Sequence, residues 1–363
     1  MRFGPAGYPK VGSKSDPEAS LGVTKEMGLD ALEVEFVRGA RINEERAKAI
    51  GACARGLDIR LSCHAPYFIS FNSDNPETID KSVQWVVDTA RAAHWLGAYI
   101  IVIHAAAYGS RPEAATENVI KGLAESKDRL DDMGVKDVIL GVETMGKKGQ
   151  FGTLKEITQV MSSVDGVRPV LDVAHVHARG GGCIKNEEDM RALVDEFFPL
   201  CGDVAHFHIS CIKYGEKGEI SHLPLSEKEP DMQYLADVLG DSDRDCTFIC
   251  ESPLVEKDAA VFRDMFPKYR RARKEEGTRW KLSQSLRPPF SWHSSSWQPR
   301  SSSPQSDAGL MAPRTIYGRA HTGGIRTRLF TVVVAIAVIV AIVLTAIGAV
   351  IFLDRCPFIG DNK

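Results

Sequence analysis

The stretch VILGVETMGKKGQFGTLKEITQVMSSVDGVRPVLDVAH, residues 138–175, determines the fold class. It begins with a short apolar run that ends on Glu143 and continues through an amphipathic segment, residues 151–163. It then returns to a second apolar run that ends on Asp172. Apolar runs of this length predict buried strands, and the segment between them has the apolar spacing of a helix. The stretch therefore predicts one strand–helix–strand unit.

The same alternation continues through residues 1–275, where eight apolar runs predict strands and amphipathic stretches predict the helices that follow them. Eight such units in about 270 residues are typical of a (β/α)8 TIM barrel. A doubly wound open sheet is the alternative, but the sequence after the first run, GPAGYPKVGSKSD, is a poor match to a Gly-rich phosphate turn. The predicted strands are residues 2–7, 31–37, 59–64, 99–104, 138–143, 168–172, 204–209 and 247–251.

Charge is distributed unevenly, so the formal net charge of −3 over 363 residues averages three unlike segments. Residues 1–267 hold 30 Lys and Arg against 43 Asp and Glu, a balance of −13. Residues 268–328 hold 13 basic against 3 acidic residues, and residues 329–363 hold two of each. The composition, 44% hydrophobic and 26% charged, excludes a wholly disordered or polytopic membrane protein. We interpret the segments as an acidic body, a basic connector and an apolar tail.

The tail predicts a membrane anchor. Residues 329–353 form a run of 25 residues without a charge, and a helix of this length, at ~1.5 Å per residue, exceeds the ~30 Å hydrocarbon core of a bilayer. Four arginines lie in residues 314–328 and two basic residues follow the run, which predicts a cytoplasmic body. Residues 276–328, rich in Ser, Pro and Arg, predict a flexible linker, and residues 354–363 a short tail.

Side chains that can bind metals close six successive predicted strands. A TIM barrel carries its chemistry at the carboxyl ends of its strands, so these side chains are expected to meet there. A carboxylate directed into the barrel mouth is unfavourable unless it is paired or bound to metal. Imidazoles and carboxylates together form a ligand set for Zn²⁺ or Mn²⁺. The candidates are His64, His104, Glu143, Asp172 with His175 one turn later, His208 and Glu251, with His222 in the loop after the seventh strand.

The remaining histidines of the body have other predicted roles. His94 falls in a helical pattern, which indicates a surface or packing position. His177 follows the sixth strand, where a supporting or solvent-exposed role is favoured over ligation. His206 shares the inward face of its strand with His208 but lies one layer deeper, which predicts a packed structural role.

With these residues in place, the body resembles the endonuclease IV family of apurinic/apyrimidinic endonucleases, within the xylose-isomerase-like TIM barrels. The resemblance covers roughly residues 1–270, and its short motifs are specific because of their order and spacing. The motifs are HAPY (64–67), VIH (102–104), VET (142–144), LDVAH (171–175), HIS (208–210), HLPL (222–225) and CES (250–252).

The resemblance implies a monomeric enzyme that holds two or three zinc ions, with Mn²⁺ as another possible metal. It also implies cleavage of DNA 5′ to abasic sites in base excision repair, where a multi-metal site activates water as hydroxide. By position, the first metal would be held by His64, His104 and Glu143, the second by Glu143, Asp172, His208 and Glu251, and the third by His175 and His222.

The same resemblance implies roles in catalysis and substrate binding. Glu143 and Glu251 would orient the attacking nucleophile. Tyr67 would pack on the extruded sugar-phosphate of the damaged site. Arg38 and Arg41, which follow the second predicted strand, would read or prop the bent duplex.

One departure from the family pattern concerns the third metal. The family carries an Asp two residues before the last His ligand, in a DxH pattern. Here GEISHLPL places Ile220 at that position, and Glu219 lies one residue further back. Three alternatives follow: Glu219 reaches the site through a shifted loop, two metals suffice, or the activity differs.

A second interpretation is a sugar or sugar-phosphate isomerase or epimerase of the same superfamily, with one divalent metal and two glutamates as acid and base around an enediolate. The acidic body favours it, because a DNA-binding surface usually needs a basic face. His64 and His104 oppose it, because a one-metal enzyme does not need them as ligands. A third interpretation, a scaffold with a decayed barrel, is disfavoured by the intact cluster. The one-metal ligand set is matched by Glu143, Asp172, His208 and Glu251.

Overall fold

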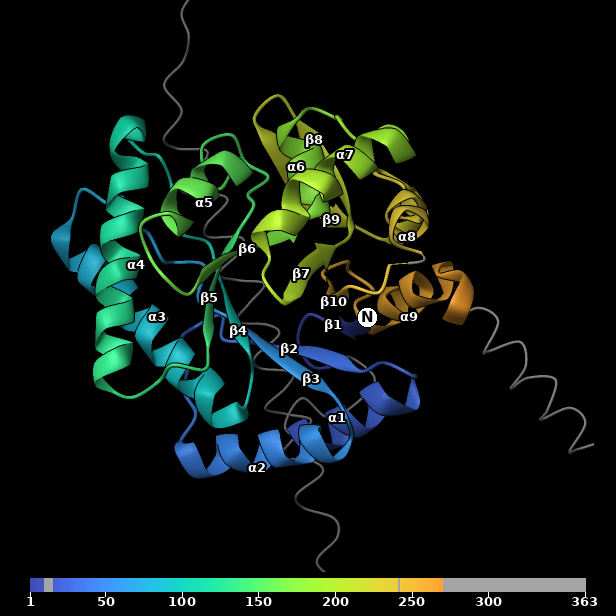
Figure 1. Cartoon of the computed structure of the whole chain (residues 1–363), viewed down its shortest axis with the longest axis horizontal. Helices are drawn as coiled ribbons and strands as arrows, with labels where there is room; N and C mark the ends of the chain where they lie inside the picture. The colour runs from blue at the N-terminus through green and yellow to red at the C-terminus, as the bar shows by residue number, and fades with distance from the viewer. Residues whose placement is uncertain (10–15, 241, 270–363) are drawn as a thin grey trace, which may run out of the picture. The chain divides into compact units, whose positions relative to one another are not determined.

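The computed structural model describes residues 1–9, 16–240 and 242–269, and these residues form the predicted TIM barrel (Figure 1). Within them, eight parallel strands follow one another in the order β1-β10-β7-β6-β5-β4-β3-β2. A parallel bridge from Ala6 to Glu33 joins the first strand to the last, so the sheet closes on itself. The strands are β1 (Arg2–Pro5), β2 (Ala31–Glu35), β3 (Arg60–His64), β4 (Ile100–Ile103), β5 (Ile139–Glu143), β6 (Val167–Asp172), β7 (Val204–Ile209) and β10 (Asp245–Cys250).

The helices surround the barrel, and most begin at caps that the sequence provides (Figure 1). Asn43 caps α2 and Asn75 caps α3, each through a side-chain oxygen that accepts a backbone N–H. Thr153 and Glu156 form a capping box at the start of α5. The helices are α1 (Pro17–Glu26), α2 (Glu44–Gly56), α3 (Pro76–Leu96), α4 (Ala115–Asp132), α5 (Leu154–Met161), α6 (Val173–Arg179), α7 (Glu187–Phe197), α8 (Gln233–Leu239) and α9 (Glu256–Met265), with 3-10 turns at Pro112–Ala114, Phe198–Leu200 and Leu225–Glu227.

The sequence did not predict two elements near the carboxyl ends of the strands. Helix α6 begins directly after β6, where only a loop was expected. After β7, an antiparallel hairpin of β8 (Cys211–Gly215) and β9 (Gly218–Leu223) replaces the predicted loop. Both elements are short and rich in polar residues, so they lack the long apolar periodicity on which the prediction depends.

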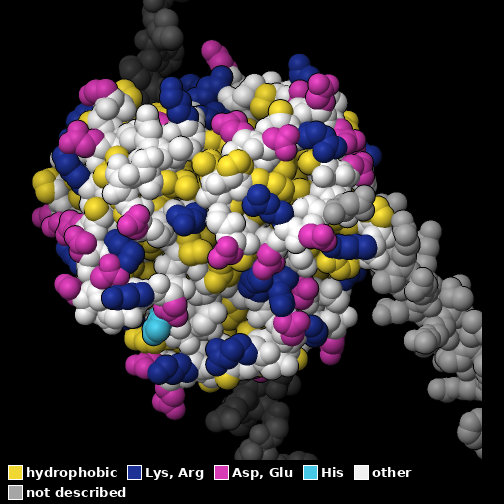
Figure 2. Space-filling view, viewed as in Figure 1, with side chains coloured by type: hydrophobic (Ala, Val, Ile, Leu, Met, Phe, Trp, Pro, Cys, Tyr) yellow, Lys and Arg dark blue, Asp and Glu magenta, His cyan; other side chains and the backbone are white. Residues whose placement is uncertain are grey.

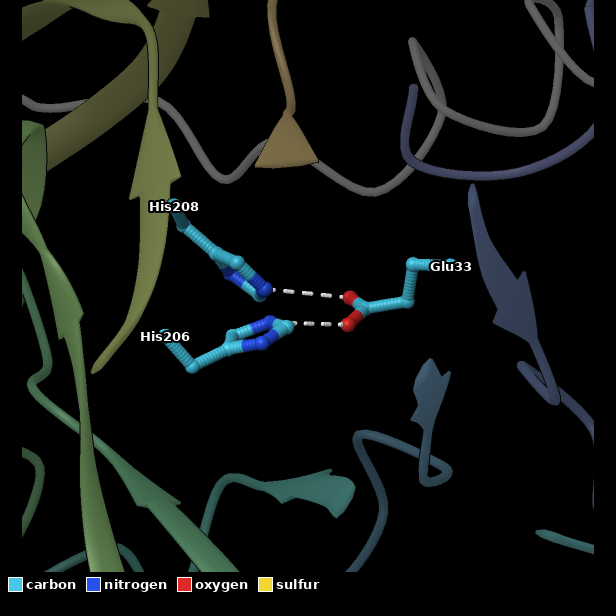
Figure 3. A group of neighbouring side chains, drawn as sticks. All are labelled: Glu33, His206 and His208. Atoms are coloured by element: carbon cyan, nitrogen blue, oxygen red, sulfur yellow. Dashed lines mark ion pairs between the residues drawn. The ribbon is translucent and has the colours of Figure 1, made fainter. Parts of the chain in front are cut away.

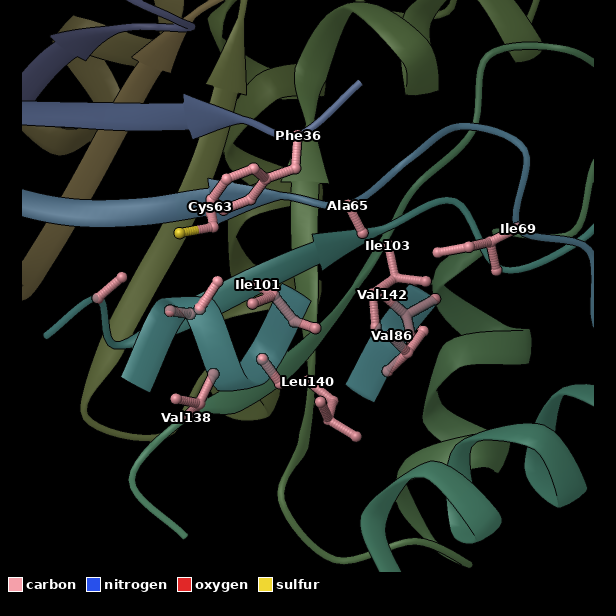
Figure 4. Packing of buried hydrophobic residues seen from close by; sticks show 14 of the residues in the cluster. Phe36, Cys63, Ala65, Ile69, Val86, Ile101, Ile103, Val138, Leu140 and Val142 are labelled. Atoms are coloured by element: carbon pink, nitrogen blue, oxygen red, sulfur yellow. The ribbon is translucent and has the colours of Figure 1, made fainter. Parts of the chain in front are cut away.

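Side chains of each strand alternate between the helix layer and the barrel interior. In β4, Ile101 and Ile103 belong to the core that α3 covers, whereas Ile100 and Val102 belong to a separate small cluster. Figure 4 shows Ile101 and Ile103 beside Val86 of α3. This alternation places the last residue of a strand on a defined side, and it directs the polar residues at the strand ends inward.

The chain shows no helix long and apolar enough to span a membrane in the part that the structure describes. The predicted linker (276–328), transmembrane helix (329–353) and tail (354–363) lie outside the described residues. The membrane anchor and the cytoplasmic location therefore stay predictions.

Aromatic side chains of β1, β10 and α9 pack against one another, and substitutions on α9 can test this packing. Phe262 is fully buried, and its ring lies 5.3 Å from that of Phe248 and 6.0 Å from that of Phe3. Phe262→Ala is expected to lower the free energy of unfolding by about 3–5 kcal/mol, because it opens a cavity among these side chains. Val261→Ala, at a 49% exposed position of the same helix, should change it by no more than about 0.5 kcal/mol. Equal losses for the two variants in urea unfolding would contradict this assignment of the core.

Candidate metal centre

All the predicted ligands come together at the carboxyl ends of β3 to β7 and of β10. His175 reaches this place from α6, and His222 reaches it from β9. The ligands fall into adjoining groups, in each of which the potential ligand atoms lie within 4.8 Å of one another. Glu143 belongs to the first and second groups, and Asp172 belongs to the second and third. The groups are His64, His104 and Glu143; Glu143, Asp172, His208 and Glu251; and Asp172, His175 and His222.

Glu143 is fully buried at the end of β5, and both of its carboxylate oxygens face histidines. Oε2 lies 2.7 Å from His104 Nε2 and 3.5 Å from His64 Nε2, and Oε1 lies 3.2 Å from His208 Nδ1. Burial by itself raises the pKa of Glu143, but the charges of His104 and His208 hold it well below its ordinary value. The side chain is therefore an anion that two groups of potential ligands share.

The scaffold holds one ring nitrogen in several of the candidate ligands. His64 Nδ1 donates to the carbonyl of the next residue at 2.7 Å, and His175 Nδ1 donates to the Thr144 carbonyl at 2.9 Å. His222 Nδ1 lies 2.7 Å from Ser210 Oγ. Nε2 of His64 and of His222 faces Glu143 and Glu251, and Nε2 of His175 faces Glu219. A ring nitrogen that is free while the other is held is the arrangement that a metal-binding histidine requires.

Asp172 is both the last residue of β6 and the N-cap of α6. Its Oδ1 accepts the backbone N–H of His175 at 2.7 Å, so the first turn of α6 fixes the position of His175 relative to Asp172. The other oxygen, Oδ2, is buried and has no hydrogen-bond partner. Burial raises the pKa of Asp172 to about 6. A buried carboxylate oxygen without a donor fits a site for a cation.

The β8–β9 hairpin contains a β-bulge at the position where the sequence departs from the family pattern. Lys213 pairs with Ser221 and the next residue, Tyr214, pairs with Glu219, so Ile220 has no partner across the hairpin. An inserted residue of this kind changes the alternation of side chains along its strand. The bulge therefore re-aims the side chains that precede it.

The bulge brings Glu219 to the third group in place of Ile220. Glu219 Oε2 lies 3.5 Å from His175 Nε2, whereas the Ile220 side chain is 58% exposed. Gly146 permits this approach, because a Cβ there would lie 2.7 Å from Glu219 Cβ and 2.9 Å from His175 Cδ2. Of the alternatives that the sequence left open, the geometry favours the one in which Glu219 reaches the site.

Glu251 follows β10 directly and is the member of the second group at the mouth of the barrel. Its Oε1 lies 3.1 Å from His208 Nδ1, and its Oε2 lies 3.7 Å from His222 Nε2. Burial raises its pKa, but the charge of His208 outweighs burial and lowers the value to about 2. The side chain keeps 17% of its surface exposed, so it is an anion that solvent can reach.

The predicted substrate-binding residues lie outside the ligand groups. Tyr67 follows β3 and is 57% exposed, with its ring 4.4 Å from the ring of Phe68. Arg38 and Arg41 are exposed in the loop after β2. Loops that leave the carboxyl ends of barrel strands border the site, so these side chains can reach a large substrate but not the metal ligands.

Two acidic residues of β2, Glu33 and Glu35, also lie at the site, although the sequence did not predict them as site residues. Glu33 is fully buried, and Glu35 lies in register with His64 at the mouth of the barrel. Glu35 Oε1 is buried without a hydrogen-bond partner, and burial raises the pKa of Glu35 to about 7. The signal was present in ALEVE, residues 31–35, because two glutamates at alternate positions of a strand share one face.

The other histidines take positions outside the three ligand groups. His94 on α3 pairs with Asp137 at 2.7 Å, in agreement with a surface role. His177 is buried in α6, and its Nε2 lies 2.6 Å from Glu229 Oε1. His206 is buried inside the barrel, as predicted.

Comparison with known proteins places this geometry in a family. Residues 21–271 match the family model described as "Xylose isomerase-like TIM barrel". An uncharacterized protein of Methanocaldococcus jannaschii is 33% identical over 264 residues, which are 71% of this chain and 94% of that protein. A probable endonuclease 4 of Bacillus subtilis is 28% identical over 216 residues, which are 56% of this chain and 69% of the relative.

Solved structures share the fold at lower identity. Endonuclease IV from Thermus thermophilus aligns with a TM-score of 0.56 at 21% identity, over 74% of this chain and 99% of that structure. A D-tagatose 3-epimerase-like protein aligns with a TM-score of 0.58 at 17% identity, over 76% of this chain and 99% of that structure. Because both a nuclease and an epimerase-like protein align equally well, this likeness concerns the fold alone.

Metal affinity should rise with pH. Burial lowers the pKa of His64 and of His175, but neighbouring carboxylates outweigh burial and raise both values to about 10. These carboxylates are mainly Glu143 and Glu35 for His64, and Asp172 and Glu143 for His175. Below that pH both rings are protonated in the metal-free protein, and a metal must displace these protons. Competition titrations with Zn²⁺ at about pH 6, 7 and 8 should show roughly a tenfold or greater gain in apparent affinity per pH unit. An affinity independent of pH would contradict ligation by these rings.

Glu219→Gln should weaken the binding of one metal equivalent by about tenfold or more, because the third group loses an anionic ligand. Glu216→Gln, in the exposed turn of the same hairpin, is the matched control and should leave all equivalents in place. Dialysis against buffers of fixed free Zn²⁺, followed by elemental analysis, measures the difference. Identical binding curves for the two variants would show that Glu219 is not a ligand.

Proposed function

Because the chain belongs to the xylose isomerase-like TIM barrel family, we propose that it is a metal-dependent phosphodiester hydrolase that resembles endonuclease IV and cleaves DNA 5′ to abasic sites. The observation that carries the proposal is the presence of two further ligand groups beside the four-residue group, each with two histidines. A one-metal enzyme has no need for either. Imidazole and carboxylate ligands in these numbers suit two or three Zn²⁺ ions, and Mn²⁺ is the second choice.

The chain's own residues have defined parts in such a reaction. Divalent ions bound at these groups would lower the pKa of a water to ~7 and stabilise negative charge on the phosphate oxygens. Glu251 is an anion at the mouth of the barrel, so it can accept a hydrogen bond from the attacking water and orient it. Glu143, deeper and without solvent exposure, keeps His64 and His104 in place.

The loops after β2 and β3 supply groups suited to a nucleic acid. Tyr67, Phe68 and Trp85 form a run of neighbouring rings with centroid distances of 4.4 Å and 5.9 Å. An exposed aromatic surface can pack against a sugar or base that has left the duplex. Arg38 and Arg41, which are exposed in the loop after β2, would contact phosphates near that sugar or base.

A one-metal sugar isomerase or epimerase is the second candidate, and the charge of the barrel favours it. Figure 2 shows that Lys and Arg alternate with Asp and Glu on the face drawn, rather than gathering into one basic surface. Glu33 and Glu35 add buried carboxylates to the interior, close to where a phosphate would bind. An uncharged polyol tolerates such surroundings better than a phosphodiester does, and Glu143 with Glu251 would then serve as the acid and base.

The two candidates are separated by assaying the purified full-length chain. With Zn²⁺ and a duplex that carries one abasic site, we expect a single nick 5′ to the lesion and no cleavage of the intact duplex. His104→Ala should reduce nicking by about 100-fold or more, because the first metal loses a ligand. His94→Ala, on the outer surface of α3, should not change the rate.

The outcome that would overturn the nuclease proposal is also defined. With Mn²⁺ or Mg²⁺, an epimerase would exchange the proton next to a ketose carbonyl without nicking DNA. Such exchange would be lost in Glu251→Gln but would change little in His104→Ala. That combination, together with a single bound metal ion, would establish the second candidate.

A further inference from the structure

Glu33 lies inside the barrel, deeper than the predicted metal ligands. It is in the middle of β2, and its side chain has no solvent exposure. A buried carboxylate is strongly unfavourable unless it is surrounded by donors or cations. Glu33 lies outside the three groups of predicted metal ligands, and with His206 and His208 it forms a fourth group whose potential ligand atoms lie within 4.8 Å of one another.

Three side chains converge on the Glu33 carboxylate: Ser62 through a hydrogen bond, and His206 and His208 at ion-pair distance without a hydrogen bond. Ser62 Oγ donates to Oε2 at 2.7 Å, and His206 Nε2 lies 3.2 Å from the same oxygen. His208 Nε2 lies 3.0 Å from Oε1. Figure 3 shows both imidazole rings directed toward the two oxygens of Glu33. The carboxylate thus spans two rings that come from alternate positions of β7.

The far side of His206 is also fixed. Tyr99 Oη lies 2.6 Å from His206 Nδ1, whereas Nε2 of the same ring lies 3.2 Å from Glu33 without forming a hydrogen bond. The hydroxyl can donate to Nδ1, and Nε2–H then points at Glu33. His206 therefore faces Oε2 of Glu33, while Oε1 remains for His208.

His208 is the ring for which this matters, because its other nitrogen faces the second metal group. His208 Nδ1 lies 3.1 Å from Glu251 Oε1 and 3.2 Å from Glu143 Oε1. A neutral imidazole carries one N–H, and it can bind a metal only through the other nitrogen. If Nε2, which faces Glu33, carries the N–H, Nδ1 keeps its lone pair for the metal.

Three other candidate rings are held at Nδ1. His64 and His175 donate Nδ1–H to backbone carbonyls, and His222 Nδ1 contacts a serine hydroxyl. Among these four rings, His208 is the one whose Nδ1 is held by neither a carbonyl nor a hydroxyl, and the Glu33 carboxylate lies beside its Nε2. A carboxylate partner also makes the imidazole a stronger metal ligand than a carbonyl partner does.

We propose that Glu33 is a positioning residue for His208: its negative charge, 3.0 Å from Nε2, favours the proton on that nitrogen and thereby leaves Nδ1 as the ligand of the second metal. The assignment rests on the metal centre proposed above but not on the identity of the substrate. It holds equally for a nuclease and for an epimerase, because the four-residue group that includes His208 is common to both.

The first test is metal binding by the full-length chain. Glu33→Gln keeps the shape of the side chain but removes its charge, and it should weaken one metal equivalent by about 10–100-fold. Asp30→Asn is the matched control, since it removes a carboxylate directly before β2 that accepts the Phe3 N–H at 2.8 Å. The control should bind metal as the wild type does. With Co²⁺ in place of Zn²⁺, the visible spectrum of Glu33→Gln should change, and that of Asp30→Asn should not.

The second test uses the wild type and so does not depend on the folding of a variant. In protein with ¹⁵N-labelled histidine and bound ¹¹³Cd²⁺, one ring should couple to the metal through Nδ1 and carry its proton on Nε2. The remaining metal-coupled rings should bind through Nε2. The absence of an Nδ1-bound ring, or unchanged affinity and spectrum in Glu33→Gln, would overturn the proposal. If the wild type gives these metal readouts but does not nick the abasic duplex, the nuclease function is contradicted and the assignment of Glu33 stands.

Discussion

The site depends on one fully buried anion, Glu143. A carboxylate without solvent exposure costs several kcal/mol unless cations or donors surround it, and its two oxygens are met by histidines from β3, β4 and β7. Those strands come together only when the barrel closes, so the electrostatics of Glu143 and the topology of the sheet support each other. Divalent ions would complete the same balance for Asp172, whose Oδ2 has no donor.

Around this anion, the scaffold controls which nitrogen of each ring is available. Backbone carbonyls hold His64 and His175, and a hydroxyl meets His222. Nδ1 of His208 is held by neither, and the Glu33 carboxylate lies beside its Nε2. Fixing a ring before a metal arrives removes the cost of ordering it on binding, and it limits the geometry that the ion can adopt. The polar interior of this barrel is therefore part of the metal centre rather than an irregularity of the core.

The charge of the site bears on the substrate. Glu33 and Glu35 extend the row of carboxylates beyond the predicted ligands, and the face drawn in Figure 2 mixes both signs of charge. Bound divalent ions offset the acidic interior at the point where a phosphate would approach. The groups suited to a nucleic acid, Tyr67 with Arg38 and Arg41, lie instead in the loops of the rim. Affinity for a duplex would then depend on the metals and on those loops.

The strands of the barrel and the side chains at their ends could be read from the sequence alone, because short apolar runs and the residues that end them are local properties of the chain. Glu143, Asp172, His208 and Glu251 were found in this way. The tertiary structure decided that Glu219 rather than Ile220 faces the third group, and that Glu33 lies behind His208. A β-bulge and the depth of a residue within the barrel depend on the register between strands, and register is set by contacts between residues far apart in the chain.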